Sequence, residues 1–115
     1  MFRRFGVAAL LLSMASGVAA QGDPADDPVA LGRELVETYC AACHSIEVDG
    51  DSPHDQAPPF RTLHERYELE WLEEGLVEGL VSGHPDMPEF EFDPDQAQSI
   101  IAYLETLTPK PKPKE

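Results

Sequence analysis

Apolar residues recur at helical spacing in three separate stretches of this chain. The first runs from Val29 to about Cys40, the second from Glu68 to Leu80, and the third from Pro94 to about Leu107. Apolar side chains that return every three or four residues favour amphipathic helices with one face toward a core. No stretch shows the alternation of apolar and polar residues that is typical of a strand. The pattern therefore predicts an all-α fold, with three to four short helices joined by long loops.

Two of the predicted helices begin with the same dipeptide. Asp27-Pro28 precedes the first and Asp93-Pro94 precedes the third, and an aspartate N-cap followed by proline is a typical helix start. Gly32 lies inside the first helix, where glycine costs about 1 kcal/mol relative to alanine. We therefore expect another element of the fold to approach this helix closely at Gly32.

Segments rich in proline and acidic residues separate the helices. Residues 45–60 form a long predicted loop, and a loop of this length in a small domain usually has a function. Residues 61–67 are expected to form a short turn or helix, and residues 83–92 an irregular segment. Residues 108–115 alternate proline and lysine, which favours an extended, disordered tail in solvent.

Residues 1–20 have the pattern of a secretory signal peptide. Two arginines precede an apolar run, and small residues up to Ala20 predict a cleavage that leaves Gln21 at the new N-terminus. We therefore expect export to the periplasm, with residues 21–27 as a flexible acidic leader and residues 28–107 as the folded domain. Retention of the apolar run as an anchor is the alternative, although the run is short for a membrane span.

Length and charge narrow the range of functions. The chain has 115 residues and a formal net charge of −14, and removal of the two signal-peptide arginines makes this charge −16. A chain of this size forms one domain at most. Its acidity argues against nucleic-acid binding, which needs clustered lysine and arginine. So small a domain usually needs a disulfide, a metal or a bound cofactor to stabilise its core.

The main chemical motif is Cys40-Ala41-Ala42-Cys43-His44. In an exported chain, a C-x-x-C-H motif indicates covalent attachment of haem c. Cys40 and Cys43 would form thioethers with the haem, and His44 would bind the iron as its proximal ligand. A thioredoxin-like dithiol, a disulfide, and a zinc site that uses the chain's histidines are the alternatives.

The haem iron needs a second axial ligand or an open site. Met87 is the only methionine that remains after signal cleavage, and it lies in the irregular segment before the last helix. We expect Met87 to be the distal iron ligand. His84 is the rival, and it would give an iron with two histidine ligands and a lower reduction potential. Otherwise His54, His64 and His84 are expected to be exposed loop histidines.

Several motifs together resemble a known family. Besides the C-x-x-C-H motif, the chain has Ala57-Pro-Pro-Phe60 in its middle, Met87-Pro-Glu-Phe90 before the last helix, and Ile101-Ala-Tyr-Leu104 within that helix. In this order they look like a small bacterial class I cytochrome c over residues 28–107. The resemblance implies a cytochrome c-like fold wrapped around one covalent haem c, with histidine and methionine as iron ligands.

The resemblance also implies neighbours for the haem. A proline carbonyl in the middle loop accepts the outer proton of the proximal histidine, with Pro58 as the best match and Pro59 as the alternative. Arg61 is expected beside a haem propionate or, alternatively, in solvent, and Trp71 in the core or near a propionate. In this family an aromatic residue of the last helix touches the glycine of the first helix. Tyr103 matches it, and we expect it in the haem environment.

The expected function is electron transfer between redox partners rather than enzymatic catalysis. The only basic residues in 28–107 are Arg33, Arg61 and Arg66, so the lysine-driven docking of mitochondrial cytochromes does not transfer. The acidic surface instead predicts a dehydrogenase, oxidase or reductase with a basic docking patch. We expect a monomer with no membrane span after signal cleavage. A haem c subunit of a larger oxidoreductase complex and a gas-binding haem protein are the alternatives.

Overall fold

The structure is a computed structural model that describes residues 11–12, 14, 16–17 and 26–109. The predicted cleavage site after Ala20, most of the predicted signal peptide and leader, and the lysines of the predicted tail lie outside the described residues. Within the described part of the chain, no helix has the length and apolar character needed to cross a membrane.

Four helices form the secondary structure of the described residues, in the order α1 (Pro28–Tyr39), η2 (Phe60–Glu65), α2 (Leu69–Glu78) and α3 (Pro94–Leu107). They confirm the predicted all-α fold, and residues 26–109 contain no strand. η2 is a 3-10 helix in the segment that was expected to form a short turn or helix. α2 ends before Leu80 because Gly79 adopts a φ of +103°, which favours glycine and interrupts the helix.

Both aspartate–proline pairs start their helices as predicted. The Asp27 carboxylate accepts hydrogen bonds from the N–H groups of Val29 and Ala30, at 3.0 and 3.3 Å. The Asp93 carboxylate accepts from the N–H of Gln96 at 2.8 Å, and the Gln96 side chain accepts from the N–H of Asp93 at 3.2 Å. This reciprocal pair is a capping box. The caps fix the starts of α1 and α3, the two helices at the centre of the fold.

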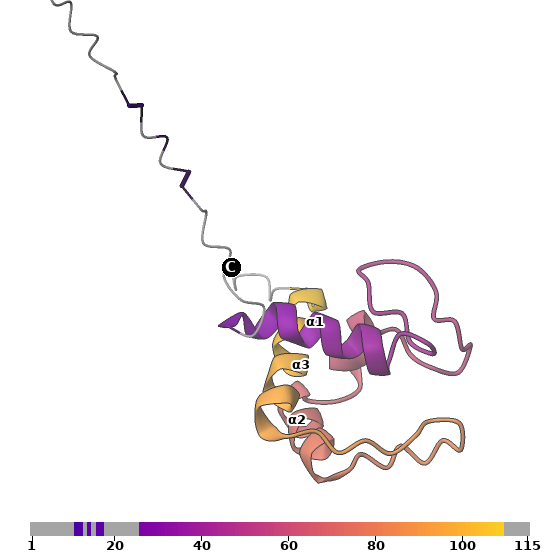
Figure 1. The fold of residues 1–115 in the computed structure, drawn as a ribbon. Coiled ribbons are helices and arrows are strands. Elements are labelled where there is room, and N and C mark those ends of the chain that lie inside the picture. The colour runs from indigo at the N-terminus through magenta and orange to yellow at the C-terminus, as the bar shows by residue number, and fades with distance from the viewer. Residues whose placement is uncertain (1–10, 13, 15, 18–25, 110–115) are drawn as a thin grey trace, which may run out of the picture.

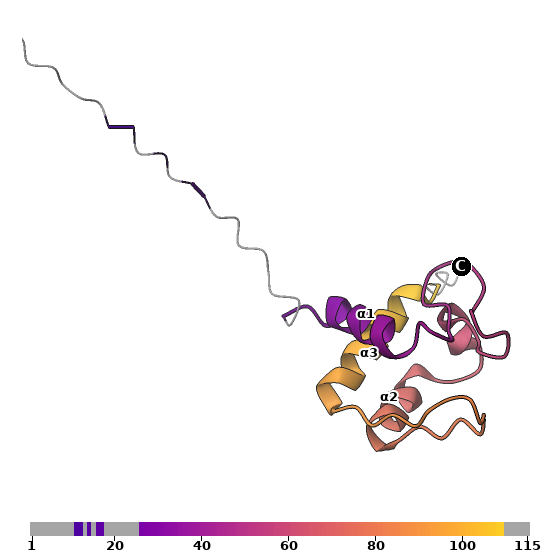
Figure 2. The same ribbon diagram turned by 45° about the vertical axis from the view of Figure 1, so that its right-hand side comes forward.

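The crossing of α1 and α3 is the most extensive contact between elements of the fold (Figures 1 and 2). Gly32 lies at this crossing, where an added Cβ would be 1.8 Å from the backbone oxygen of Ser99 and 2.9 Å from the Cβ of Tyr103. Only a residue without a Cβ allows the helices to come this close. The close approach expected at Gly32 is confirmed, and the backbone of Ser99 comes nearer to it than the expected aromatic side chain.

The core is built mainly by α1 and α3, with additions from the loops. α3 lies between α1 and α2 in both views (Figures 1 and 2). α2 packs on α3 but has no buried residue, and its apolar stripe is only half-buried. The loops 45–59 and 80–92 extend from the same side of the helices. The buried apolar residues are Leu35, Val36, Ile46, Phe60, Phe92, Ala97, Ile100, Ile101, Tyr103 and Leu104.

Trp71 is not in the core, so the expectation of core packing was wrong. Its side chain is 70% exposed. The apolar stripe of α2 contains Leu69 and Leu76, which pack toward the core. Trp71 is two residues after Leu69 and therefore about 200° around the helix from it. The size of the indole suggested burial, but the phase of the helix places it on the outer face.

Candidate functional site

The segment 40–44 forms one tight turn at the end of α1. The N–H of Cys40 donates to the carbonyl of Val36 at 2.9 Å and closes the last turn of the helix. The N–H groups of Cys43 and His44 both donate to the carbonyl of Cys40, at 3.2 and 2.9 Å. The turn therefore carries both thiols and the imidazole as one unit.

The structure lends no support to the other chemistries considered for the two cysteines. Cys40 and Cys43 are not bonded to each other, which argues against a disulfide. No group of three or more His, Cys, Asp or Glu side chains among the described residues is arranged to hold a metal ion. A thioredoxin-like dithiol would need strands, which residues 26–109 lack. Burial also raises the pKa of the Cys40 thiol to about 11, so this thiol is protonated at neutral pH.

The ring of His44 is held in one orientation by its surroundings. Nδ1 of His44 lies 2.8 Å from the carbonyl oxygen of Pro58, and a carbonyl can only accept, so Nδ1 carries the proton and donates it. The ring of Phe60 lies beside the imidazole, with centroids 4.7 Å apart. The N–H of Phe60 donates to the carbonyl of Ser45 at 2.9 Å, which ties the two ends of the 45–59 loop together. Nε2 of His44 therefore keeps its lone pair for a metal.

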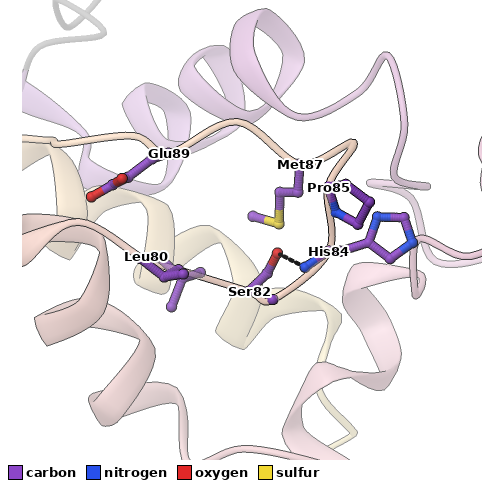
Figure 3. A pocket seen from close by; sticks show the side chains of 8 residues that line it. Leu80, Ser82, His84, Pro85, Met87 and Glu89 are labelled. Carbon is purple, nitrogen blue, oxygen red and sulfur yellow. Dashed lines mark hydrogen bonds between the residues drawn. The ribbon is translucent and has the colours of Figure 1, made fainter.

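Met87 lies in a loop around a shallow pocket of about 310 Å³ that is lined by residues 80–85, 87 and 89 (Figure 3). Its half-buried thioether points toward Leu80 and Ser82, whereas the ring of His84 points away from the pocket. The N–H of Met87 donates to the carbonyl of His84 at 3.2 Å and closes the turn between them. The loop therefore offers the sulfur and the imidazole in different directions.

Apolar side chains around these groups fit a large flat apolar cofactor. Cys40 and Ala41 pack against the same core cluster as the stripe of α2. Because no residue of α2 is buried, this stripe leaves apolar surface that the described protein atoms do not cover. A porphyrin fixed at the 40–44 turn would cover apolar surface and stabilise the fold by doing so. The partly buried side chains are Leu31, Leu63, Leu69, Leu72, Leu76, Val77, Phe90 and Leu107.

Comparison with known proteins agrees with the interpretation of the 40–44 turn as a haem-attachment site. The cytochrome c family model matches residues 29–108, which is most of the chain. The chain belongs to the cytochrome c family. The cytochrome is also similar to the "Cytochrome c-553-like" protein of Synechocystis sp., with 31% identity over 77 residues that cover 66% of this chain and 66% of that protein. No solved structure matches it. Membership establishes a small class I c-type cytochrome with covalent haem c and a role in electron transfer.

Arg61 and Tyr103 of the cytochrome have partners within the protein. Nη1 of Arg61 donates to the carbonyl of Gly50 at 2.8 Å and to the hydroxyl of Ser45 at 3.4 Å. Arg61 therefore holds the start of the 45–59 loop rather than lying free in solvent. The buried hydroxyl of Tyr103 donates to the carbonyl of Ile46 at 2.6 Å and accepts from Nη1 of Arg33 at 3.0 Å. Tyr103 thus connects α3 to the residues that follow His44.

The expectation of exposed loop histidines was wrong for His54, His64 and His84, because all three are half-buried. His64 lies on η2, and its Nδ1 is buried with no hydrogen-bond partner among the described residues. The rings of His54 and His84 meet edge to face, with centroids 5.6 Å apart. Sequence analysis missed this contact between loops. Neither loop alone indicates this contact, because the two histidines lie about 30 positions apart in the sequence.

Proposed function

We propose that this cytochrome is a periplasmic electron carrier, not an enzyme, with one haem attached through Cys40 and Cys43. In this proposal His44 and Met87 are the axial ligands of the iron. The hydrogen bond from Nδ1 of His44 to Pro58 carries the proposal, because it fixes the imidazole and leaves Nε2 free. The haem iron, when bound, accepts and releases one electron.

In this proposal the residues of the site anchor the haem, orient the proximal histidine and supply the distal ligand. The single turn that holds Cys40, Cys43 and His44 supplies three anchor points on one rigid unit. The carbonyl of Pro58 draws on the His44 proton and makes the imidazole a stronger donor to iron. Met87 contributes a neutral thioether, and a histidine–methionine pair gives a higher reduction potential than two histidines.

The surroundings of His84 favour Met87 over His84 as the distal ligand. Nδ1 of His84 accepts from the N–H of Asp86 at 3.4 Å, and its Nε2 hydrogen-bonds to the side-chain oxygen of Gln56. Both ring nitrogens are therefore occupied, and the ring points away from the pocket that holds the thioether (Figure 3). Coordination by His84 would break the hydrogen bond of the nitrogen that binds the iron and would require the ring to turn toward the pocket, whereas no hydrogen bond of the Met87 thioether would be lost.

The charge of the folded part supports a redox partner with a basic docking patch. Arg33 is paired with Glu37 at 2.9 Å and with Glu47 at 2.7 Å, and Arg61 is bound within the 45–59 loop. Few cations are left to offset the acidic side chains, so a dehydrogenase, oxidase or reductase with a basic face would be attracted. The proposal also includes cleavage after Ala20, a folded domain at 28–107 and a monomer in solution.

Spectra of the haem-loaded wild type and two variants test the ligands. The pyridine haemochrome reports thioether-linked haem, and the far-red absorbance band of the ferric protein reports bonding of methionine to iron. We expect Met87→Ala to lose this band and to lower the reduction potential, and His84→Ala to keep the band. A band that survives Met87→Ala would exclude Met87, and a wild-type protein without the band that binds carbon monoxide would favour the gas-binding alternative.

A further inference from the structure

Two loops that are far apart in sequence carry the same local hydrogen bond. In His54-Asp55-Gln56, the N–H of Gln56 donates to Nδ1 of His54 at 3.2 Å. In His84-Pro85-Asp86, the N–H of Asp86 donates to Nδ1 of His84 at 3.4 Å. Since Nδ1 accepts in both rings, each neutral imidazole carries its proton on Nε2.

Each Nε2–H group is directed to the other loop. His54 donates from Nε2 to Oδ2 of Asp86 at 3.2 Å, and His84 donates from Nε2 to Oε1 of Gln56. Each acceptor therefore belongs to the residue whose N–H binds the opposite histidine, which makes the arrangement reciprocal. The two rings lie against each other at an interplanar angle of 89°. The four side chains of His54, Gln56, His84 and Asp86 are called the histidine latch.

The histidine latch lies next to both proposed iron ligands. The N–H of His54 donates to the carbonyl of Cys43 at 3.0 Å, directly before His44. On the other loop, Asp86 immediately precedes Met87, and the carbonyl of His84 accepts from the N–H of Met87. The latch thus links the backbone at the haem-attachment turn to the three residues that directly precede Met87.

We propose that the histidine latch positions Met87, so that its four side chains are positioning residues for the Met87–iron bond. This inference rests on the proposed function, in which Met87 is the distal ligand. Phe92 is buried at the end of loop 80–92, but the part before Met87 is otherwise lightly anchored, since residues 81–83 and 85–86 are exposed. Two hydrogen bonds and a ring contact across the loops restrict the positions open to the thioether, so less conformational freedom is lost when it binds.

Competition by imidazole at the ferric iron of the haem-loaded protein tests the proposal. Asp86→Ala removes one acceptor of the latch, and we expect imidazole to displace Met87 about two- to fivefold more readily, because the Asp86 side chain is 67% exposed and an exposed pair contributes less than a buried one. Asp86→Asn keeps an acceptor for His54 and should restore the wild-type affinity. Asp55→Ala is the matched control: its carboxylate is 98% exposed, lies 3.8 Å from Nδ1 of His54 and does not reach the other loop.

A double-mutant comparison separates the latch from a general effect of charge. Adding His54→Ala to Asp86→Ala should raise the imidazole affinity little further, because their shared hydrogen bond is already lost. Equal effects of Asp86→Ala and Asp55→Ala, or an Asp86→Asn variant that behaves like Asp86→Ala, would overturn the proposal.

Amide hydrogen exchange separates failure of the latch from failure of the proposed ligand. In Asp86→Ala, amide exchange at His84 and Met87 should be about two- to fivefold faster than in Asp55→Ala, whichever residue binds the iron. Unchanged exchange would show that the latch does not hold the loop. If Asp86→Ala exchanges faster but the wild-type protein lacks the methionine–iron band, the latch still holds the loop and Met87 is not the ligand.

Discussion

Replacing Gly32 with alanine tests how strongly the α1–α3 crossing limits the stability of the fold. The added Cβ would lie 1.8 Å from the backbone oxygen of Ser99 and 2.6 Å from its carbonyl carbon. Ordinary contact begins at 3.4 Å, so the two helices must separate locally by about 1.6 Å. The obstructing atoms belong to the backbone of α3, so they cannot rotate away as a flexible side chain can.

The expected magnitude follows from two opposing effects. Overpacking costs about 3 kcal/mol at the upper end of the usual range, which fits a clash with backbone atoms. The better helix propensity of alanine offsets about 1 kcal/mol of this cost. We therefore expect Gly32→Ala to lower the free energy of unfolding by about 2 kcal/mol, and the midpoint of thermal unfolding by about 8–16 °C.

Gly75 provides a matched control for this substitution. It also lies inside a helix, but a Cβ added there would be close only to Cδ1 of Leu80, at 2.9 Å and at the end of a flexible side chain, with the other Leu80 atoms at ordinary contact distance. Gly75→Ala should be neutral or stabilise the protein by up to about 1 kcal/mol. Denaturant unfolding of the oxidised haem-loaded proteins, followed by circular dichroism, measures both effects. A Gly32→Ala protein as stable as wild type, or equal losses at Gly32 and Gly75, would refute the reasoning.

Four further predictions concern the buried tyrosine, the exposed tryptophan and the acidic surface. Tyr103→Phe leaves the Ile46 carbonyl without its donor and should lower the free energy of unfolding by about 1–2 kcal/mol in urea titration; an unchanged midpoint would contradict this. Burial raises the pKa of the Tyr103 hydroxyl from its ordinary value of 10.0, so at high pH the native state keeps a proton that the unfolded chain loses. The free energy of unfolding should therefore fall as pH rises above about 10, and it should fall less in Tyr103→Phe. Trp71→Ala should change the free energy of unfolding by less than about 0.5 kcal/mol, whereas a loss of several kcal/mol would place the indole in the core. Electron transfer to a basic partner, measured by stopped flow, should slow as ionic strength rises; a rate that increases with salt would indicate an acidic partner face.

Sequence predicts the parts of this fold that depend on local chemistry. The helix starts at Asp27 and Asp93 follow from side chains that cap the next few N–H groups, and the structure has both. Gly32 was predictable as a point of close approach because glycine destabilises a helix interior, and close packing of another element is a common reason for it. The bond between His44 and Pro58 was expected from the family resemblance, and the distance of 2.8 Å agrees with it.

Two contacts between distant segments, the histidine latch and the hydrogen bonds of Arg61, were not predicted. The latch joins residues about 30 positions apart, and nothing in either loop alone indicates its partner. Arg61 was expected near a propionate or in solvent, but its geometry depends on how the 45–59 loop folds back on itself. The outward position of Trp71, in contrast, was available from the phase of α2 and was overlooked because large aromatic residues are usually buried.

The absence of buried residues in α2 implies that the fold is held together unevenly. α1 and α3 share a close crossing and most of the buried side chains, so they form the most cooperative unit of the fold. α2 offers only half-buried apolar side chains to the rest of the protein, so burial of apolar surface stabilises its attachment less than that of α1 or α3. Local opening should therefore begin at α2 and the loop that follows it, while the α1–α3 pair unfolds only with the whole domain.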